Sequence, residues 1–224
     1  MAGVLVIGVA VVDFVFAVDT LPSQPTKYRA QTAEIVGGGC AANAAVAIAR
    51  LGGRAVLGAR LGDDAIGEMI VEDLGREGVD CALVQRTSGA RSSFSSVYVD
   101  NAGERQIMNF RGQGLTSETA WIAQAPRMGA VLADTRWSEG AKRALALAAE
   151  WGVPGVVDAE APMDPAALVG ASHVAFSRDG LLDFTGESKI EAGLIARELL
   201  LRRRVQHIVI CAPPGVLDQW REEM

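Results

Sequence analysis

The stretch from Gly37 to Gly53, GGGCAANAAVAIARLGG, places three glycines before an alanine-rich segment whose first turn carries one polar side chain, Asn43. Glycine adopts backbone angles that other residues avoid and lets a ligand approach the main chain, and the first turn of a helix has unpaired N–H donors. The pattern therefore predicts a loop that binds a polar ligand. A tight turn leading into a core helix is the alternative when the stretch is taken alone.

The same stretch matches the loose dinucleotide-binding pattern G-x-G-x-x-A from Gly37 to Ala42. That pattern normally follows the first buried strand of a βαβ unit. Here it follows a mixed segment, Tyr28–Val36, whereas the first buried strand is expected at Val4–Gly8. No G-K-[ST] sequence follows, so a Walker A loop is excluded, and a nicotinamide- or flavin-binding fold is disfavoured.

The composition indicates one main domain with a substantial core, because half of the 224 residues are apolar. Lys and Arg total 21 against 27 Asp and Glu, a net charge of −6. This balance gives no electrostatic case for nucleic acid or an anionic membrane surface, so a small-molecule ligand is expected. The apolar runs are short and follow no basic segment, which predicts a cytoplasmic chain without a signal peptide or a membrane span.

Cysteine usage gives no sign of a disulfide framework or a zinc site. Cys40, Cys81 and Cys211 are widely separated and show no C-x-x-C spacing. We therefore expect buried free thiols and no metal site.

Apolar runs alternate with amphipathic segments, which predicts a mainly parallel sheet covered by helices on both faces. The expected strands are Val4–Gly8, Ala55–Arg60, Ala130–Ala133, Gly155–Asp158, Ala171–Phe176 and Val205–Cys211. The expected helices are Asn43–Leu51, Ala65–Glu77, Glu139–Trp151 and Lys189–Arg203.

Two segments, at approximately 13–36 and 91–111, break this alternation and predict a second, antiparallel layer. Asp13–Asp19 pairs with Tyr28–Val36 in this interpretation, and Ser93–Asp100 and Glu104–Phe110 flank a short Asn101-Ala102-Gly103 turn. Ligands of open α/β sheets bind beyond the carboxyl ends of the strands. A small sheet projecting there would act as a lid.

Several motifs in this order resemble the ribokinase-like (PfkB) sugar kinases: VIGVAVVDFVFAVD, GGGCAAN, LGARLGDDAIGEMIVEDLGREGVD and the GER hairpin. The resemblance covers the chain from Val4 to about Cys211. It implies a three-layer αβα fold with a mainly parallel sheet and a small antiparallel β lid. It also implies ATP-dependent phosphorylation with Mg²⁺, and a sugar held by Asp13, Gly38, Gly39 and Asn43. An aspartate accepting from two hydroxyls, beside an asparagine that both donates and accepts, suits the vicinal hydroxyls of a sugar.

A narrower resemblance is to ketohexokinases and sulfofructose kinases, in LPSQPTKYRAQTAEIVGGG, VLADTRWSEGAK and ASHVAFSRDGLLDFTG. It implies that Lys27, Asn109 and Arg136 surround a sulfonate, and charge-assisted donors suit such an anion. The alternative is that Lys27 and Arg136 are solvated loop cations and the substrate is a neutral ketose such as fructose.

Two departures from the family pattern limit what the resemblance implies. Ser177-Arg178-Asp179-Gly180 stands where many members have N-x-x-E, which leaves the magnesium site unassigned. The signature D-T-x-G-A-G-D, whose last Asp is the catalytic base in the family, is absent. We therefore assign no catalytic residue, leave the cofactor-binding residues unknown, and expect a single ribokinase-like domain over 1–224 without its C-terminal nucleotide-binding and catalytic part.

Two further expectations concern the end of the chain and its assembly. The resemblance stops near residue 209, which favours a truncation or frameshift, and a non-catalytic sugar-binding remnant is the alternative to a kinase. Because lid strands in this family often pair between subunits, a homodimer is plausible.

Overall fold

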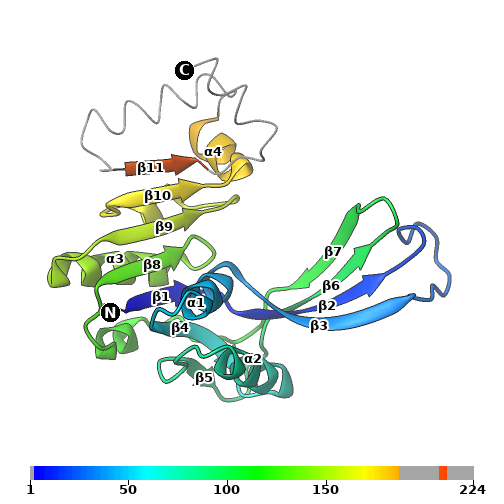
Figure 1. Cartoon of the computed structure of the whole chain (residues 1–224), viewed down its shortest axis with the longest axis horizontal. Helices are drawn as coiled ribbons and strands as arrows, with labels where there is room; N and C mark the ends of the chain where they lie inside the picture. Colours follow the sequence, from blue (N-terminus) through cyan, green and yellow to red (C-terminus); the bar gives the residue numbers. More distant parts are fainter. Residues whose placement is uncertain (1–2, 187–206, 211–224) are drawn as a thin grey trace.

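The computed structural model describes residues 3–186 and 207–210, which form an α/β body and a curved sheet that projects from it (Figure 1). Seven strands of the body lie in the order β11-β10-β9-β8-β1-β4-β5, and the paired strands run parallel. In chain order they are β1 (Val4–Gly8), β4 (Ala55–Gly62), β5 (Gln85–Thr87), β8 (Ala130–Asp134), β9 (Gly155–Ala159), β10 (His173–Phe176) and β11 (His207–Ile210).

Helices cover both faces of this sheet, as the alternating pattern predicts. Leu5 and Ile7 of β1 face one way and pack in a core with α3 (Ser138–Trp151), while Val6 faces the other way. That second core contains α1 (Cys40–Arg50) and α2 (Ala65–Arg76). A third cluster joins α3, the ends of β9 and β10, and α4 (Arg178–Thr185). The body also contains two short 3₁₀ helices, η1 (Ala120–Gln124) and η2 (Pro165–Leu168).

The projecting sheet, called the lid below, has the order β3-β2-β6-β7. Its strands are β2 (Val11–Ala17), β3 (Thr32–Gly38), β6 (Phe94–Val99) and β7 (Arg105–Phe110). The outer pairs are antiparallel, but β2 and β6 run parallel, so the expectation of an antiparallel lid was wrong at its centre. Parallel neighbours need a long crossover, which the intervening α1-β4-α2-β5 segment supplies.

Several boundaries differ from the sequence prediction. Helix α1 begins at Cys40 rather than Asn43, and β3 begins at Thr32 rather than Tyr28. The Tyr28 hydroxyl accepts hydrogen bonds from the backbone N–H groups of Ser23 and Gln24, at 3.0 and 2.9 Å, which holds Tyr28 in a loop.

Other differences are smaller. The strand expected from Ala171 starts at His173, and β5 and α4 were not predicted. The helix expected at Lys189–Arg203 and the ends of the strand expected at Val205–Cys211 lie outside the described residues. Cys40 and Cys81 are free, as expected, but half-buried rather than buried. Among the described residues, no helix is both long and apolar enough to cross a membrane.

Candidate functional site

A cavity of about 550 Å³ lies where the ends of β1 and β8 meet the lid, and we call it the lid cavity. Its polar lining comes from both layers. Asp13 and Asn109 stand on lid strands, while Arg60 and Arg136 come from the ends of β4 and β8. This is the position beyond the carboxyl ends of parallel strands where open α/β sheets bind ligands.

The lid presents a row of polar side chains to this cavity. In the strand register Asp13 of β2 is the partner of Ser95 of β6, and Ser95 is the partner of Asn109 of β7, so all three share one face of the sheet. The Asn109 amide donates a 3.1 Å hydrogen bond to the Ser95 hydroxyl. Among the described residues no N–H or O–H group donates to the half-buried carboxylate of Asp13, so its oxygens are available to hydroxyl groups of a ligand.

The start of α1 is anchored from the opposite wall by Asp134, the last residue of β8. Its side chain is buried at 1% exposure and accepts backbone hydrogen bonds from Val9 (2.8 Å), Ala41 (3.1 Å) and Arg136 (3.0 Å). Ala41 is in the first turn of α1, so Asp134 supplies the cap that the helix's own N-cap residue, a glycine, lacks. Burial raises the pKa of Asp134, and the three N–H bonds oppose that rise.

The glycine loop before α1 is shaped by close backbone approach. Gly39 has φ +95°, and a Cβ there would lie 2.4 Å from the carbonyl oxygen of Val9. Gly8 is equally restricted, because a Cβ there would lie 2.2 Å from the Asp134 carboxylate. These contacts explain why the sequence needs glycine at both positions.

Arg136 is paired inside the site with Glu160, which follows β9. The Arg136 Nε and Nη2 groups both donate to Glu160 Oε2, at 3.1 and 2.7 Å. The Cys40 thiol donates to the same oxygen at 3.3 Å. Burial, followed by the negative charge of Glu160 and then of Asp134, raises the pKa of Cys40 to about 12, so this thiol is neutral at physiological pH.

Two further arginines line the cavity. Arg60 lies with its guanidinium carbon 4.2 Å from the ring centre of Trp137 and donates from Nη1 to the carbonyl of Thr116 at 3.0 Å. Burial lowers the pKa of Arg60. Arg111 is exposed at the rim. Within the part of the chain that the structure describes, three arginines and one carboxylate, Asp13, line the cavity, a balance that suits a ligand with an anionic group.

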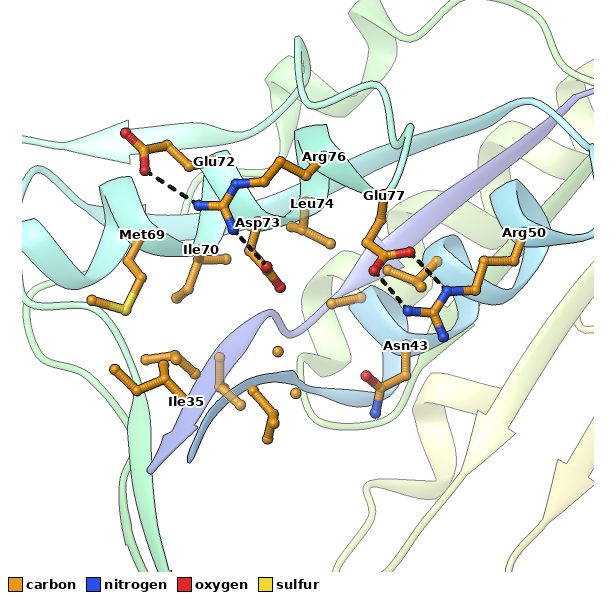
Figure 2. Close-up of a pocket in the computed structure, with 17 residues that line it drawn as sticks. Ile35, Asn43, Arg50, Met69, Ile70, Glu72, Asp73, Leu74, Arg76 and Glu77 are labelled. Carbon is orange, nitrogen blue, oxygen red and sulfur yellow. Dashed lines mark hydrogen bonds and ion pairs between the residues drawn. The ribbon is translucent and has the colours of Figure 1, made fainter. Parts of the chain in front are cut away.

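A second cavity, of about 640 Å³, lies between α1, α2 and the base of β3, and we call it the hinge cavity (Figure 2). Its floor is largely apolar. Its rim carries the Arg50–Glu77 ion pair, at 2.6 Å, and Arg76 beside Asp73, at 3.3 Å. Figure 2 shows Asn43 near the Arg50–Glu77 pair.

The two cavities divide the site residues that the sequence predicts. Asp13, Gly39, Asn109 and Arg136 line the lid cavity. Gly38 and Asn43 line the hinge cavity, so the glycine loop borders both. Lys27 is exposed on the loop between β2 and β3 and lines neither cavity.

Sequence reasoning missed Ser95, Arg60, Arg111, Asp134 and Glu160 as parts of the site. A signal existed for Asp134 and for Glu160, because both lie at the ends of predicted parallel strands, where site residues gather.

The described residues do not present a ligand set for Mg²⁺. No group of three or more His, Cys, Asp or Glu side chains within 3–186 and 207–210 could hold a metal ion. Asp13 lines the lid cavity, and two carboxylates that contact cavity-lining residues are engaged: Asp134 by three N–H groups and Glu160 by Arg136.

The chain is similar to known sugar kinases. The family model described as pfkB family carbohydrate kinase matches residues 1–212. Over 74 residues the chain is 42% identical to Probable fructokinase-3 of Arabidopsis thaliana and 43% identical to Fructokinase-1 of Oryza sativa subsp. japonica. These matches cover 33% of this chain and 21% and 23% of the two relatives, so they span less than a quarter of the relatives' length.

Solved structures show the same fold over most of the chain. A candidate ribokinase from Agrobacterium tumefaciens has a TM-score of 0.81 and 31% identity, and the match covers 95% of this chain and 71% of that one. The ribokinase of Arabidopsis thaliana, solved with ribose and ATP, has a TM-score of 0.76 and 20% identity over 93% and 71% of the two chains. Halothermothrix orenii fructokinase has a TM-score of 0.74 and 20% identity over 94% and 79%.

Proposed function

Because the chain belongs to the pfkB family of carbohydrate kinases, we propose that its lid cavity binds the sugar substrate of an ATP-dependent ketose kinase. The sugar would be fructose- or sulfofructose-like and would be phosphorylated on a primary hydroxyl. The binding residues that we propose are Asp13, Gly39, Asn109 and Arg136. Gly38 and Asn43 line the neighbouring hinge cavity and Lys27 lines neither, so they are left out of this set.

The observation that carries the proposal is the polar row on the lid. The Asp13 carboxylate stands in the cavity without a donor among the described residues, beside an amide and a hydroxyl on neighbouring strands. A carboxylate accepts hydrogen bonds from two sugar hydroxyls at once, and the Asn109 amide can donate and accept. A row of this kind, opposite a helix start, suits a polyhydroxylated ligand.

The arginines favour a sugar that also carries an anionic group. Arg136 lies at the end of β8, across the cavity from the lid row, and uses only one edge of its guanidinium for Glu160. Its remaining N–H groups and the rim guanidinium of Arg111 are suitable donors to a sulfonate or a phosphate. A neutral ketose would use the lid row alone.

Within the proposed kinase, the described residues bind and orient the sugar and shield it from water beneath the lid. ATP supplies the transferred phosphoryl group in this family, and the Arabidopsis thaliana ribokinase structure contains it. Because the described carboxylates do not form a Mg²⁺ ligand set, no metal-dependent step is assigned to them. The second candidate function is sugar binding without phosphoryl transfer, which the lid cavity alone would support.

The lid is also the surface that we propose for a homodimer. Ile35, Ile107 and Met108 on its edge strands are 58%, 60% and 74% exposed. Large apolar side chains exposed on edge strands are commonly covered by pairing with another chain.

The free thiols of Cys40 and Cys81 support a reducing, cytoplasmic compartment.

Calorimetric titration with fructose, sulfofructose and fructose 6-phosphate tests the sugar site. Replacing Asp13 by Asn removes a charged acceptor, and the expected loss of affinity for each bound sugar is about 10- to 100-fold, from the usual strength of hydrogen bonds to charged groups. Arg136→Ala should weaken only the anionic sugars. Unchanged binding in Asp13→Asn would refute the site. A coupled assay of ADP release then separates the kinase from the binding protein.

A further inference from the structure

Glu160 brings together three parts of the site through a single carboxylate oxygen. Its Oε2 accepts from Nε and Nη2 of Arg136, at 3.1 and 2.7 Å, and from the thiol of Cys40, at 3.3 Å. Arg136 follows β8, Cys40 begins α1 and Glu160 follows β9. The carboxylate therefore connects the ends of two parallel strands with the helix that borders the lid cavity.

The backbone of Glu160 is held as firmly as its side chain. The Thr135 hydroxyl accepts from the Glu160 N–H group at 3.1 Å and donates to the Glu160 carbonyl at 3.0 Å. Thr135 is buried, and its own N–H donates to the carbonyl of Asp158 at 3.2 Å. Glu160 is thus a fixed acceptor rather than a mobile surface carboxylate, although its side chain is 39% exposed.

Arg136 is restrained at both ends as a result. Its backbone N–H donates to Asp134, and one edge of its guanidinium is taken by Glu160. A guanidinium has five N–H donors in a rigid plane, so fixing one edge also fixes the direction of the others. Since Arg136 lines the lid cavity, the donors left over are available to a ligand there.

We propose that Glu160 is a positioning residue that orients Arg136 for the anionic group of the sugar, and that it thereby sets the preference of the site for anionic over neutral ketoses. The inference rests on the proposed function. Glu160 does not line the lid cavity, so it acts through Arg136 rather than by touching the sugar. The Asp13 row lies on the lid strands and is independent of this contact.

Two substitutions separate orientation from charge. Glu160→Ala removes the acceptor of Arg136. We expect sulfofructose to bind about tenfold more weakly, which is the loss typical of one charge-assisted contact. The affinity for fructose should stay within about twofold of the wild type. Glu160→Gln keeps an amide oxygen that Arg136 can use, so it should retain sulfofructose affinity within about threefold of the wild type. The matched control is Glu150→Gln, which alters an ion pair with Arg143 of similar length, 2.9 Å, on the exposed side of α3.

A second measurement reads the position of Arg136 without any sugar. The Arg136 Nε–H resonance in a ¹H–¹⁵N spectrum, assigned by its loss in Arg136→Lys, should be sharp in the wild type and in Glu150→Gln. It should shift and exchange rapidly with water in Glu160→Ala, because its hydrogen-bond acceptor is gone. A folded Glu160→Ala protein with an unchanged Nε–H resonance would overturn the inference.

The outcomes distinguish this inference from the proposed function. If the wild type binds sulfofructose and Glu160→Ala binds it equally well, or loses fructose to the same extent, the inference fails and the sugar site stands. Tighter sulfofructose binding in Glu160→Ala would also overturn it, since Glu160 would then act as a competing charge. If the wild type binds no sugar, the proposed function fails, and with it the selectivity role of Glu160, whatever the Nε–H resonance shows.

Discussion

Asp134→Ala is the substitution with the largest expected effect on the lid cavity, because its one buried carboxylate accepts hydrogen bonds from three segments around the cavity. The backbone N–H groups that it accepts from belong to Val9 after β1, Ala41 in α1 and Arg136 after β8. Without the side chain these donors lose their partner in a site that is 1% exposed. The glycine loop and Arg136 would then lose their common anchor.

The size of the loss follows from those three hydrogen bonds. An unsatisfied buried donor costs about 1–3 kcal/mol, and a water molecule entering the vacated space can recover part of this. We therefore expect the free energy of unfolding to fall by about 3–5 kcal/mol, out of the 5–15 kcal/mol typical of a domain. Asp134→Asn keeps one oxygen for Val9 and Ala41, which share Oδ2, and should lose about 1–3 kcal/mol.

Urea unfolding at neutral pH, followed by circular dichroism, measures these changes. The control is Asp158→Asn at the end of the adjacent strand, where no side-chain hydrogen bond is lost among the described residues. It should show no loss of stability. An Asp134→Ala protein within about 1 kcal/mol of the wild type, with the same dependence on urea, would refute the view that this carboxylate holds the site together.

Two shorter predictions concern neighbouring positions. Gly39→Ala should destabilise the protein by more than about 2 kcal/mol and abolish sugar binding, because φ is +95° and the new Cβ would meet the Val9 carbonyl. The control is Gly103→Ala, where φ is +83° but the space around the new Cβ is open. In urea unfolding it should cost only about 1 kcal/mol. Burial, and then the charge of Glu160, raise the pKa of Asp158, so its favourable contribution exists at low pH and is lost as the pH rises through the folded-state pKa. Asp158→Asn should therefore gain thermal stability relative to the wild type as the pH rises above about 4, and a difference that does not vary with pH would contradict this.

The sequence predicts the body of the fold well because periodicity carries the information. Runs such as Val4–Gly8 are buried on both faces, as the continuous apolar pattern of a parallel strand predicts. The helix at Ala65 is predicted to within one residue. The short strand Gln85–Thr87 was missed, since three residues give no periodicity to detect. The direction of β6 beside β2 was also missed, because pairing between residues 82 positions apart depends on the crossover between the strands.

The site was predicted less completely, and the reason is the separation of its partners along the chain. The resemblance to sugar kinases implies Asp13, Asn109 and Arg136, but nothing in the sequence links Arg136 to Glu160 or both to Cys40, which lies 120 residues before Glu160. Such contacts arise only when parallel strands bring their carboxyl ends to the same edge of the sheet. The proposed site therefore depends both on the residues that line the lid cavity and on the sheet order that gives Arg136 its acceptor, Glu160. An arginine without an acceptor is a solvated cation, whereas an arginine held by an acceptor is an oriented donor. An arginine in a sequence motif therefore indicates an anionic substrate only when the fold also supplies its acceptor.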